Sequence, residues 1–191
     1  MENILLENDV VLLRPVELSD IEAIVEAAND KRIWEHMSVN LLTKEAVEKY
    51  VANAIVERKS QVSYMFVIID KKTNSVVGCT SFLDISMAHK RLEIGATWLN
   101  PAVWRTQINT NCKYLLLKYC FEQLKLNRVQ IKTGHENLRS QKAIERIGAV
   151  KEGILRNHMI RKEGIIRHTV MYSIIKEEWE TVKENFMRDL L

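Results

Sequence analysis

The order of apolar and polar positions along the chain predicts strands interrupted by helices. Strict alternation predicts a strand, because successive side chains of a strand point to opposite faces. Apolar residues three and four positions apart predict a helix. On these grounds we expect strands at residues 10–16, 62–70, 76–85, 91–99 and 127–133, and a closing hairpin at 151–175. We expect helices at residues 19–30, 43–58, 110–124 and 137–148.

This order of elements predicts a mixed α/β fold with one parallel crossover. Strands come first, a strand–helix–strand–helix unit follows, and a hairpin closes the chain. The 191 residues contain no repeat, linker or low-complexity stretch. We therefore expect a single domain that spans residues 1–191.

Composition and charge are those of an ordinary globular protein. Apolar residues make up 47% and charged residues 28%, and the formal net charge of +3 is spread over interleaved basic and acidic residues. We therefore expect no nucleic-acid and no membrane partner, and either a monomer or a homodimer. No apolar run reaches membrane-spanning length and the N-terminus lacks a signal-peptide pattern, so we expect a cytoplasmic protein.

The metal-ligating residue types predict no metal site. The cysteines Cys79, Cys112 and Cys120 form no C-x-x-C motif, and no cluster of histidine, cysteine and carboxylate residues has metal-ligand spacing. Two of the cysteines fall on the apolar face of the 110–124 helix. We interpret all three as buried, reduced thiols.

Two places in the second half of the chain carry candidate chemistry. The segment VWRTQINTNCKYLLL (103–117) connects a strand to a helix, where proteins often hold phosphate, yet it contains no glycine. Asn137 opens the next helix and Ser140 follows, at the strand end where ligands of α/β sheets lie. This spacing also fits a plain helix cap. A basic stripe on the same helix fits a solvated face or a phosphate contact. Its residues are Arg139, Lys142 and Arg146.

The strings LEIGATWLNPAVW, LLLKYCFEQLKLNRVQIKT, ENLRSQKAIERIGAVKEGILR and YSIIKEEW, in this order, resemble the GNAT superfamily of acetyl-CoA-dependent N-acetyltransferases. The most similar branch is the ribosomal-protein-alanine N-acetyltransferases, and the likeness extends from VLLRPVELSD to KEEW. It implies a mostly antiparallel mixed sheet with a splayed central pair of parallel strands and flanking helices. It also implies acetyl-CoA as co-substrate and a primary amine as acceptor.

In this family the pantetheine lies between the splayed strands, and the following loop wraps the pyrophosphate. The family pattern there, Q/R-x-x-G-x-G/A, corresponds to residues 104–109, where Gln107 and Asn109 fill both glycine positions. Helical backbone angles turn successive N–H groups toward one point without glycine, so we still expect diphosphate binding. The resemblance assigns to acetyl-CoA the residues Trp98, Leu99, Trp104, Arg105, Thr106, Gln107, Ile108, Asn109, Thr110, Asn137 and Ser140.

The resemblance also assigns catalytic roles. Glu93 would take the proton of the amine, directly or through water, and Ser140 would protonate the thiolate leaving group. Backbone N–H groups near Trp98 would polarise the thioester. Strict alternation places Glu93 with Gly95 and Thr97 on one face of its strand. The other face then holds Leu92, Ile94, Ala96 and Trp98.

Several of these residues have a plainer interpretation. Glu93 also fits a surface glutamate paired with Arg91 or Lys90. We expect Trp34 and His158 at the acceptor site, although tryptophan is more often a core residue and a lone histidine on a hairpin is more often exposed. At the level of function, the alternative to an enzyme is a non-catalytic acyl-CoA-binding or sensor domain. A nucleotide-binding protein lacks its glycine-rich motifs here.

Overall fold

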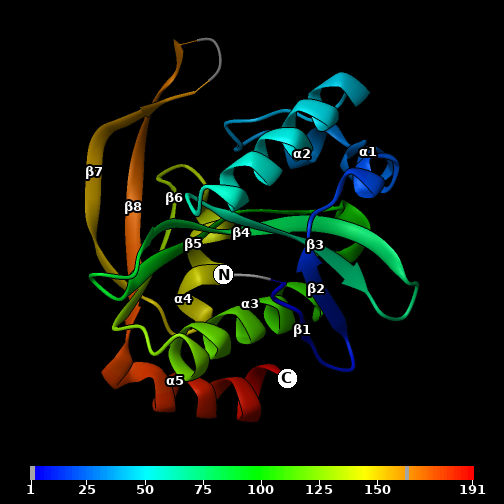
Figure 1. Cartoon of the computed structure of the whole chain (residues 1–191). Coiled ribbons are helices and arrows are strands. Elements are labelled where there is room, and N and C mark those ends of the chain that lie inside the picture. The colour runs from blue at the N-terminus through cyan, green and yellow to red at the C-terminus, as the bar shows by residue number, and fades with distance from the viewer. Residues whose placement is uncertain (1–2, 162–163) are drawn as a thin grey trace.

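An eight-stranded sheet runs through the protein, which the computed structural model describes at residues 3–161 and 164–191 (Figure 1). The strand order is β1-β2-β3-β4-β5-β6-β8-β7, and neighbours are antiparallel except β5 and β6. This confirms the predicted mixed sheet with one parallel crossover. The strands are β1 (Leu6–Glu7), β2 (Val11–Pro15), β3 (Tyr64–Asp70), β4 (Ser75–Ser86), β5 (Arg91–Leu99), β6 (Arg128–Gly134), β7 (Val150–Ile160) and β8 (Ile166–Ile175).

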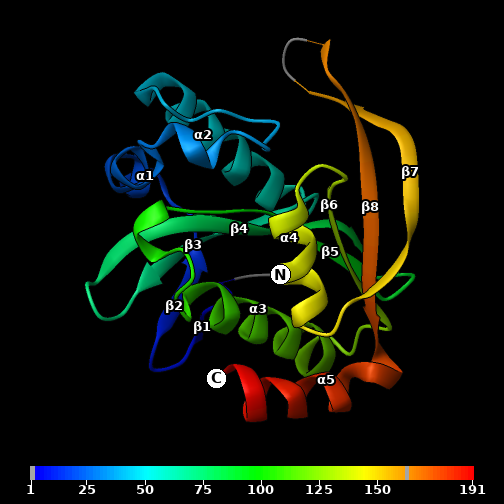
Figure 2. The ribbon, with the colours of Figure 1, turned by 180° about the vertical axis from the view of Figure 1, so that it is seen from behind.

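Helices cover both faces of the sheet. Figure 1 shows α1 and α2 on one side of the sheet and α3 and α5 on the other, and Figure 2 shows α4 from behind. The alternation of apolar positions predicted the first four helices but missed α5, which lies in a stretch dominated by charged residues. The helices are α1 (Ile21–Ala28), α2 (Lys44–Lys59), α3 (Ile108–Lys118), α4 (Leu138–Arg146) and α5 (Trp179–Asn185).

Each face of the sheet carries its own hydrophobic core. The larger core lies beneath α3, α4 and α5 and includes Phe66, Phe82, Leu92, Ile94 and Leu116. The smaller core lies beneath α1 and α2 and includes Ile24, Val51, Val67 and Trp98. The strict alternation of β6 is confirmed, because its apolar positions are buried and its polar positions face the other side.

Local polar contacts decide where the helices begin. The Thr43 hydroxyl accepts the Ala46 N–H at 3.2 Å, as its position before α2 predicts. The predicted start of the first helix at Ser19 is wrong by two residues, because a 3₁₀ turn precedes α1. The Asp20 carboxylate closes that turn by accepting the Glu17 N–H at 2.8 Å.

A bulge in β5 overturns the predicted alternation of that strand. Gly95 pairs with Ser81 and Trp98 with Cys79, so two residues of β5 stand opposite one of β4. Ala96 lies in the bulge with φ +48°. The extra residue reverses the faces beyond it, and Trp98 enters the α1–α2 core on the side of Glu93. The predicted grouping of Thr97 with Glu93, and of Trp98 with Leu92, is therefore wrong.

Two class-level observations complete the fold. All three cysteines are buried and free, which agrees with their interpretation as inert thiols. In the described ranges, no helix combines the length and the apolar character needed to cross a membrane.

Candidate active site

The two parallel strands part soon after they meet. β5 pairs with β6 only over Arg91–Glu93, although both strands continue beyond this point. The sheet therefore opens between the C-terminal halves of β5 and β6, at the edge where ligands of parallel strands lie. The expected splayed pair is confirmed, and the candidate residues gather around it.

The loop after β5 reaches α3 without glycine. Gln107 has φ −74° and ψ −8°, and α3 begins at Ile108, so both expected glycine positions adopt ordinary helical angles. The left-handed residue of the loop is Arg105, with φ +63°. Within the part of the chain that is described, the N–H groups of Gln107, Asn109 and Thr110 donate no hydrogen bond. They are the unpaired donors that every helix start presents.

Trp104 and the two arginines beside it form an unexpected arrangement. The Arg139 guanidinium carbon lies 4.1 Å from the centroid of the Trp104 ring, and that of Arg32 lies 5.8 Å from it. Such distances place both cations over the aromatic face. A groove of about 370 Å³ opens beside them, between the α1–α2 connection and the start of α4. The stack concentrates positive charge next to the start of α3.

The remaining members of the basic stripe do different things. Arg146 donates to the hydroxyl of Thr110 at 3.0 Å and so joins α4 to the first turn of α3. Lys142 is exposed. The stripe is therefore partly a helix-to-helix contact and partly a solvated face.

Asn137 caps α4 as its position predicts. Its side-chain oxygen accepts the Ser140 N–H at 3.0 Å, which leaves its amide NH₂ available. Both residues are half-buried, and within the described residues the Ser140 hydroxyl makes no hydrogen bond. The plain helix cap is thus present, and it also holds two polar groups beside the opening.

Glu93 is buried and charge-paired. It is 1% exposed, and its carboxylate accepts from Lys132 Nζ at 2.9 Å and from Gln130 Nε2 at 3.2 Å. The alternative of a surface pair with Arg91 is wrong, because Arg91 pairs with Asp84. The sequence analysis missed both partners of Glu93. The signal was there, since they occupy the polar positions of the alternating strand NRVQIKT.

A buried lysine lies on the other side of the bulge. Lys113 Nζ donates to the Thr97 hydroxyl at 2.7 Å, and that hydroxyl lies 2.7 Å from the hydroxyl of Thr80. Burial lowers the pKa of Lys113. No sequence signal pointed to this contact, because only the bulge turns Thr97 toward α3.

Comparison with known proteins assigns the family. Residues 11–150 match the Acetyltransferase (GNAT) domain family. The chain belongs to the GNAT acetyltransferases. It is 27% identical to an uncharacterized N-acetyltransferase of Bacillus licheniformis over 168 residues, 87% of this chain and 93% of that protein. It is 34% identical over 109 residues, 57% of this chain and 58% of the other, to YdaF of Bacillus subtilis, named as a candidate ribosomal N-acetyltransferase.

Solved structures give the same answer. A GCN5-related N-acetyltransferase from Brucella melitensis superposes with a TM-score of 0.92 at 26% identity, over 100% of this chain and 87% of that one. An acetyltransferase from T. thermophilus superposes with a TM-score of 0.87 at 33% identity, over 98% and 97% of the two chains. The protein is therefore an N-acetyltransferase, as the resemblance implied.

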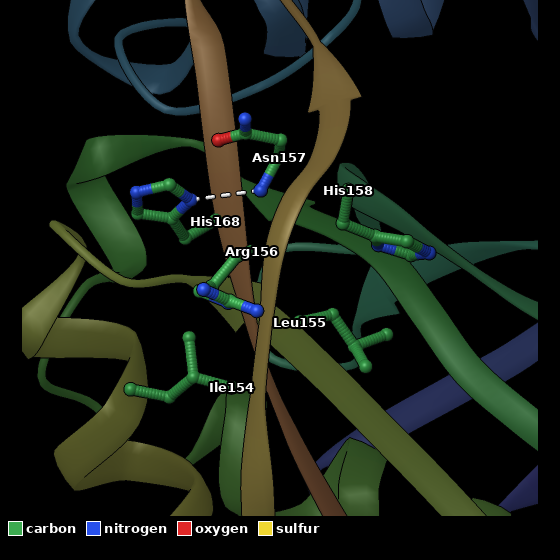
Figure 3. Close-up of a pocket in the computed structure, with 6 residues that line it drawn as sticks. All are labelled: Ile154, Leu155, Arg156, Asn157, His158 and His168. Atoms are coloured by element: carbon green, nitrogen blue, oxygen red, sulfur yellow. Dashed lines mark hydrogen bonds between the residues drawn. The ribbon is translucent and has the colours of Figure 1, made fainter.

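Two residues expected at the acceptor site of this acetyltransferase take different positions. Trp34 is 7% exposed in the α1–α2 core, stacks on Trp98 with centroids 5.3 Å apart, and donates its indole N–H to the Ala28 carbonyl at 3.0 Å. His158 is exposed on β7 and lines a groove of about 890 Å³. Figure 3 shows it pointing away from His168, whose Nδ1 accepts the Asn157 N–H at 2.9 Å. The structure therefore does not bring Trp34 and His158 together.

Proposed function

We propose that this acetyltransferase moves an acetyl group from acetyl-CoA to a primary amine, within one domain spanning residues 1–191. The observation that carries the proposal is the opening between β5 and β6. A buried carboxylate, Glu93, lies on one side of it, and unpaired helix N–H groups with nearby arginines lie on the other. A thioester and an amine need both kinds of group at once.

The residues present fit a coenzyme A diphosphate. Three unpaired backbone donors at the start of α3 suit phosphate oxygens, and the helix dipole adds to them. Arg105 lies in the loop that leads into this helix, and Arg139 is held in place by Trp104. Arginine binds phosphate through a planar fork of donors. Side chains thus supply charge where related enzymes rely on bare backbone.

Proton removal from the amine falls to Glu93 in this proposal. Acetyl-CoA supplies an activated acetyl group, but a protonated amine has no lone pair with which to attack it. The pairing with Lys132 stabilises the charged form of Glu93, which is the form that accepts a proton. A bridging water would extend its reach, so direct contact with the amine is not required.

Ser140 and Asn137 serve the leaving group and the coenzyme. As the amine nitrogen forms the C–N bond, the C–S bond breaks and sulfur takes up a negative charge. The free hydroxyl of Ser140 can donate a proton to that sulfur. The unused NH₂ of Asn137 can bond a pantetheine carbonyl. In each case the group lies at the α4 end of the opening.

The acceptor is a protein N-terminus or a small-molecule amine, and we place the reaction in the cytoplasm. A useful first experiment is calorimetry with acetyl-CoA and desulfo-CoA, followed by release of free thiol with a panel of amines. Binding followed by amine-dependent thiol release supports the proposal. Binding without turnover for any amine favours a sensor domain, and no binding rejects both. The buried cysteines keep the background of a thiol reagent low, because burial raises their pKa values.

A further inference from the structure

Arg167 is a half-buried arginine without a charge partner in the described part of the chain. It projects from β8 on the face opposite Val170, Tyr172 and Ile174, which enter the larger core. That is the face of Lys132 and Glu93. Its Nε is buried and makes no hydrogen bond, and no ion pair involves its guanidinium within residues 3–161 and 164–191. Burial, and then the neighbouring Arg161, lower its pKa.

The surroundings of Arg167 hold it at this place. Its side chain lies flat on Gly134, where a Cβ would stand 3.3 Å from the arginine Nε. Gly134 ends β6, at the mouth of the opening. The neighbouring Thr169, on the same face, is fully buried and its hydroxyl also has no hydrogen-bond partner among the described residues. Buried polar groups are normally paired, so two adjacent exceptions call for a reason.

Arg161 forms a wall next to this floor. It bonds the backbone oxygen of Glu35 in the α1–α2 connection and lies 3.8 Å from Glu136. The charges that face this space among the described residues are three cations and two carboxylates. The cations are Lys132, Arg161 and Arg167, and the carboxylates are Glu93 and Glu136. Because Lys132 is matched by Glu93 and Arg161 by Glu136, the charge of Arg167 is left over.

We propose that the acceptor amine carries an anionic group, a carboxylate or a phosphate, that binds to Arg167 with Arg161 beside it. A guanidinium that is partly removed from water and lacks a partner is a costly arrangement, and an anion on the substrate relieves it. The inference rests on the proposed function, since it names the substrate class of that same site. It makes Arg167 a specificity-determining residue that touches the acceptor away from the reacting nitrogen.

Matched pairs of acceptors test the proposal. Butylamine is compared with 4-aminobutyrate, and ethanolamine with phosphoethanolamine, by thiol release and by calorimetry in the presence of desulfo-CoA. We expect the acidic member of at least one pair to be favoured by roughly 10- to 100-fold in kcat/KM or in affinity, the range of a charged hydrogen bond. The carboxylate and phosphate arms separate the two anions. Equal or better use of the neutral amine in both pairs, in turnover and in binding, overturns the proposal.

Variants at Arg167 separate recognition from folding. Arg167→Gln should remove the preference for the acidic amine and leave the neutral amine within about twofold, while Arg167→Lys should restore part of it. Arg188→Gln is the matched control, because Arg188 lies near the C-terminus and pairs with Asp189. Equal loss for both members of a pair would reduce Arg167 to a structural residue. Acetyl-CoA binding, measured on each variant, shows whether the proposed function itself fails.

Discussion

Glu93 is the residue on which the proposed chemistry depends most. Glu93→Gln keeps the shape of the side chain and removes its basicity, so turnover at neutral pH should fall by roughly 10²–10⁴-fold. The loss should shrink at high pH, where free amine is abundant. The measurement is a pH–rate profile of wild type and variant with one acceptor. A variant profile of similar height at every pH would leave Glu93 as an orienting residue.

The ion pair of Glu93 requires a control. Removing one member of a buried pair leaves the other without its counter-charge, which destabilises the fold by itself. The double variant Glu93→Gln, Lys132→Met removes both charges and should recover most of the lost stability. It should not recover activity. Thermal unfolding of both variants separates the two effects.

At the scale of elements, the bulge of β5 places residues on both sides of the opening. Ala96 holds a left-handed backbone in it, with φ +48°. A β-branched side chain is strongly disfavoured at such an angle, so Ala96→Val should lower the free energy of unfolding by about 1–3 kcal/mol. Ala96→Gly, which tolerates the angle, should change it by less than about 1 kcal/mol. Urea unfolding of the two variants decides, and equal stabilities would mean that the bulge rearranges freely.

The loop before α3 offers a second test at this scale. Arg105 combines a left-handed backbone with a full positive charge. If its guanidinium meets a phosphate, Arg105→Ala and Arg105→Gly should both weaken acetyl-CoA binding by about 1.5–3 kcal/mol. If only the backbone angle matters, glycine should bind as wild type does and alanine should not. Calorimetry at fixed salt distinguishes these results, and unchanged affinity in both variants removes Arg105 from the site.

At the scale of the whole molecule, one ion pair ties the last helix to the rest. Glu122, in the turn after α3, accepts from Lys183 of α5 at 2.6 Å and from the Trp179 indole at 3.3 Å. The hydrogen bond from Lys183 lowers the pKa of Glu122. A carboxyl group with a lowered pKa in the folded state stabilises the protein above its unfolded pKa, and this contribution disappears as the pH falls through the folded value.

Glu122→Gln should therefore lower the melting temperature near neutral pH. The difference from wild type should narrow as the pH falls below about 4.3, the usual pKa of a glutamate, and vanish once Glu122 itself is protonated. Melting curves between about pH 3 and 7 measure it. A difference that stays constant down to the acid end of this range would assign the effect to packing and not to charge.

The sequence determined the elements and much of the site. Alternation located β6 and its buried face, and the position of Asn137 predicted the cap of α4. The argument that a phosphate loop can do without glycine also holds at Gln107, because helical angles are open to any residue. These features are local, since each depends on residues that are near neighbours in the chain.

Only the tertiary structure decided which side chains meet. Alternation counts residues, so the single extra residue of the β5 bulge reversed the predicted faces of Thr97 and Trp98. The partners of Glu93 come from β6, which the crossover through α3 brings alongside. The stack of Arg139 on Trp104 likewise joins distant segments. A contact between segments far apart in the chain depends on how strands pair and helices pack, which no local pattern records.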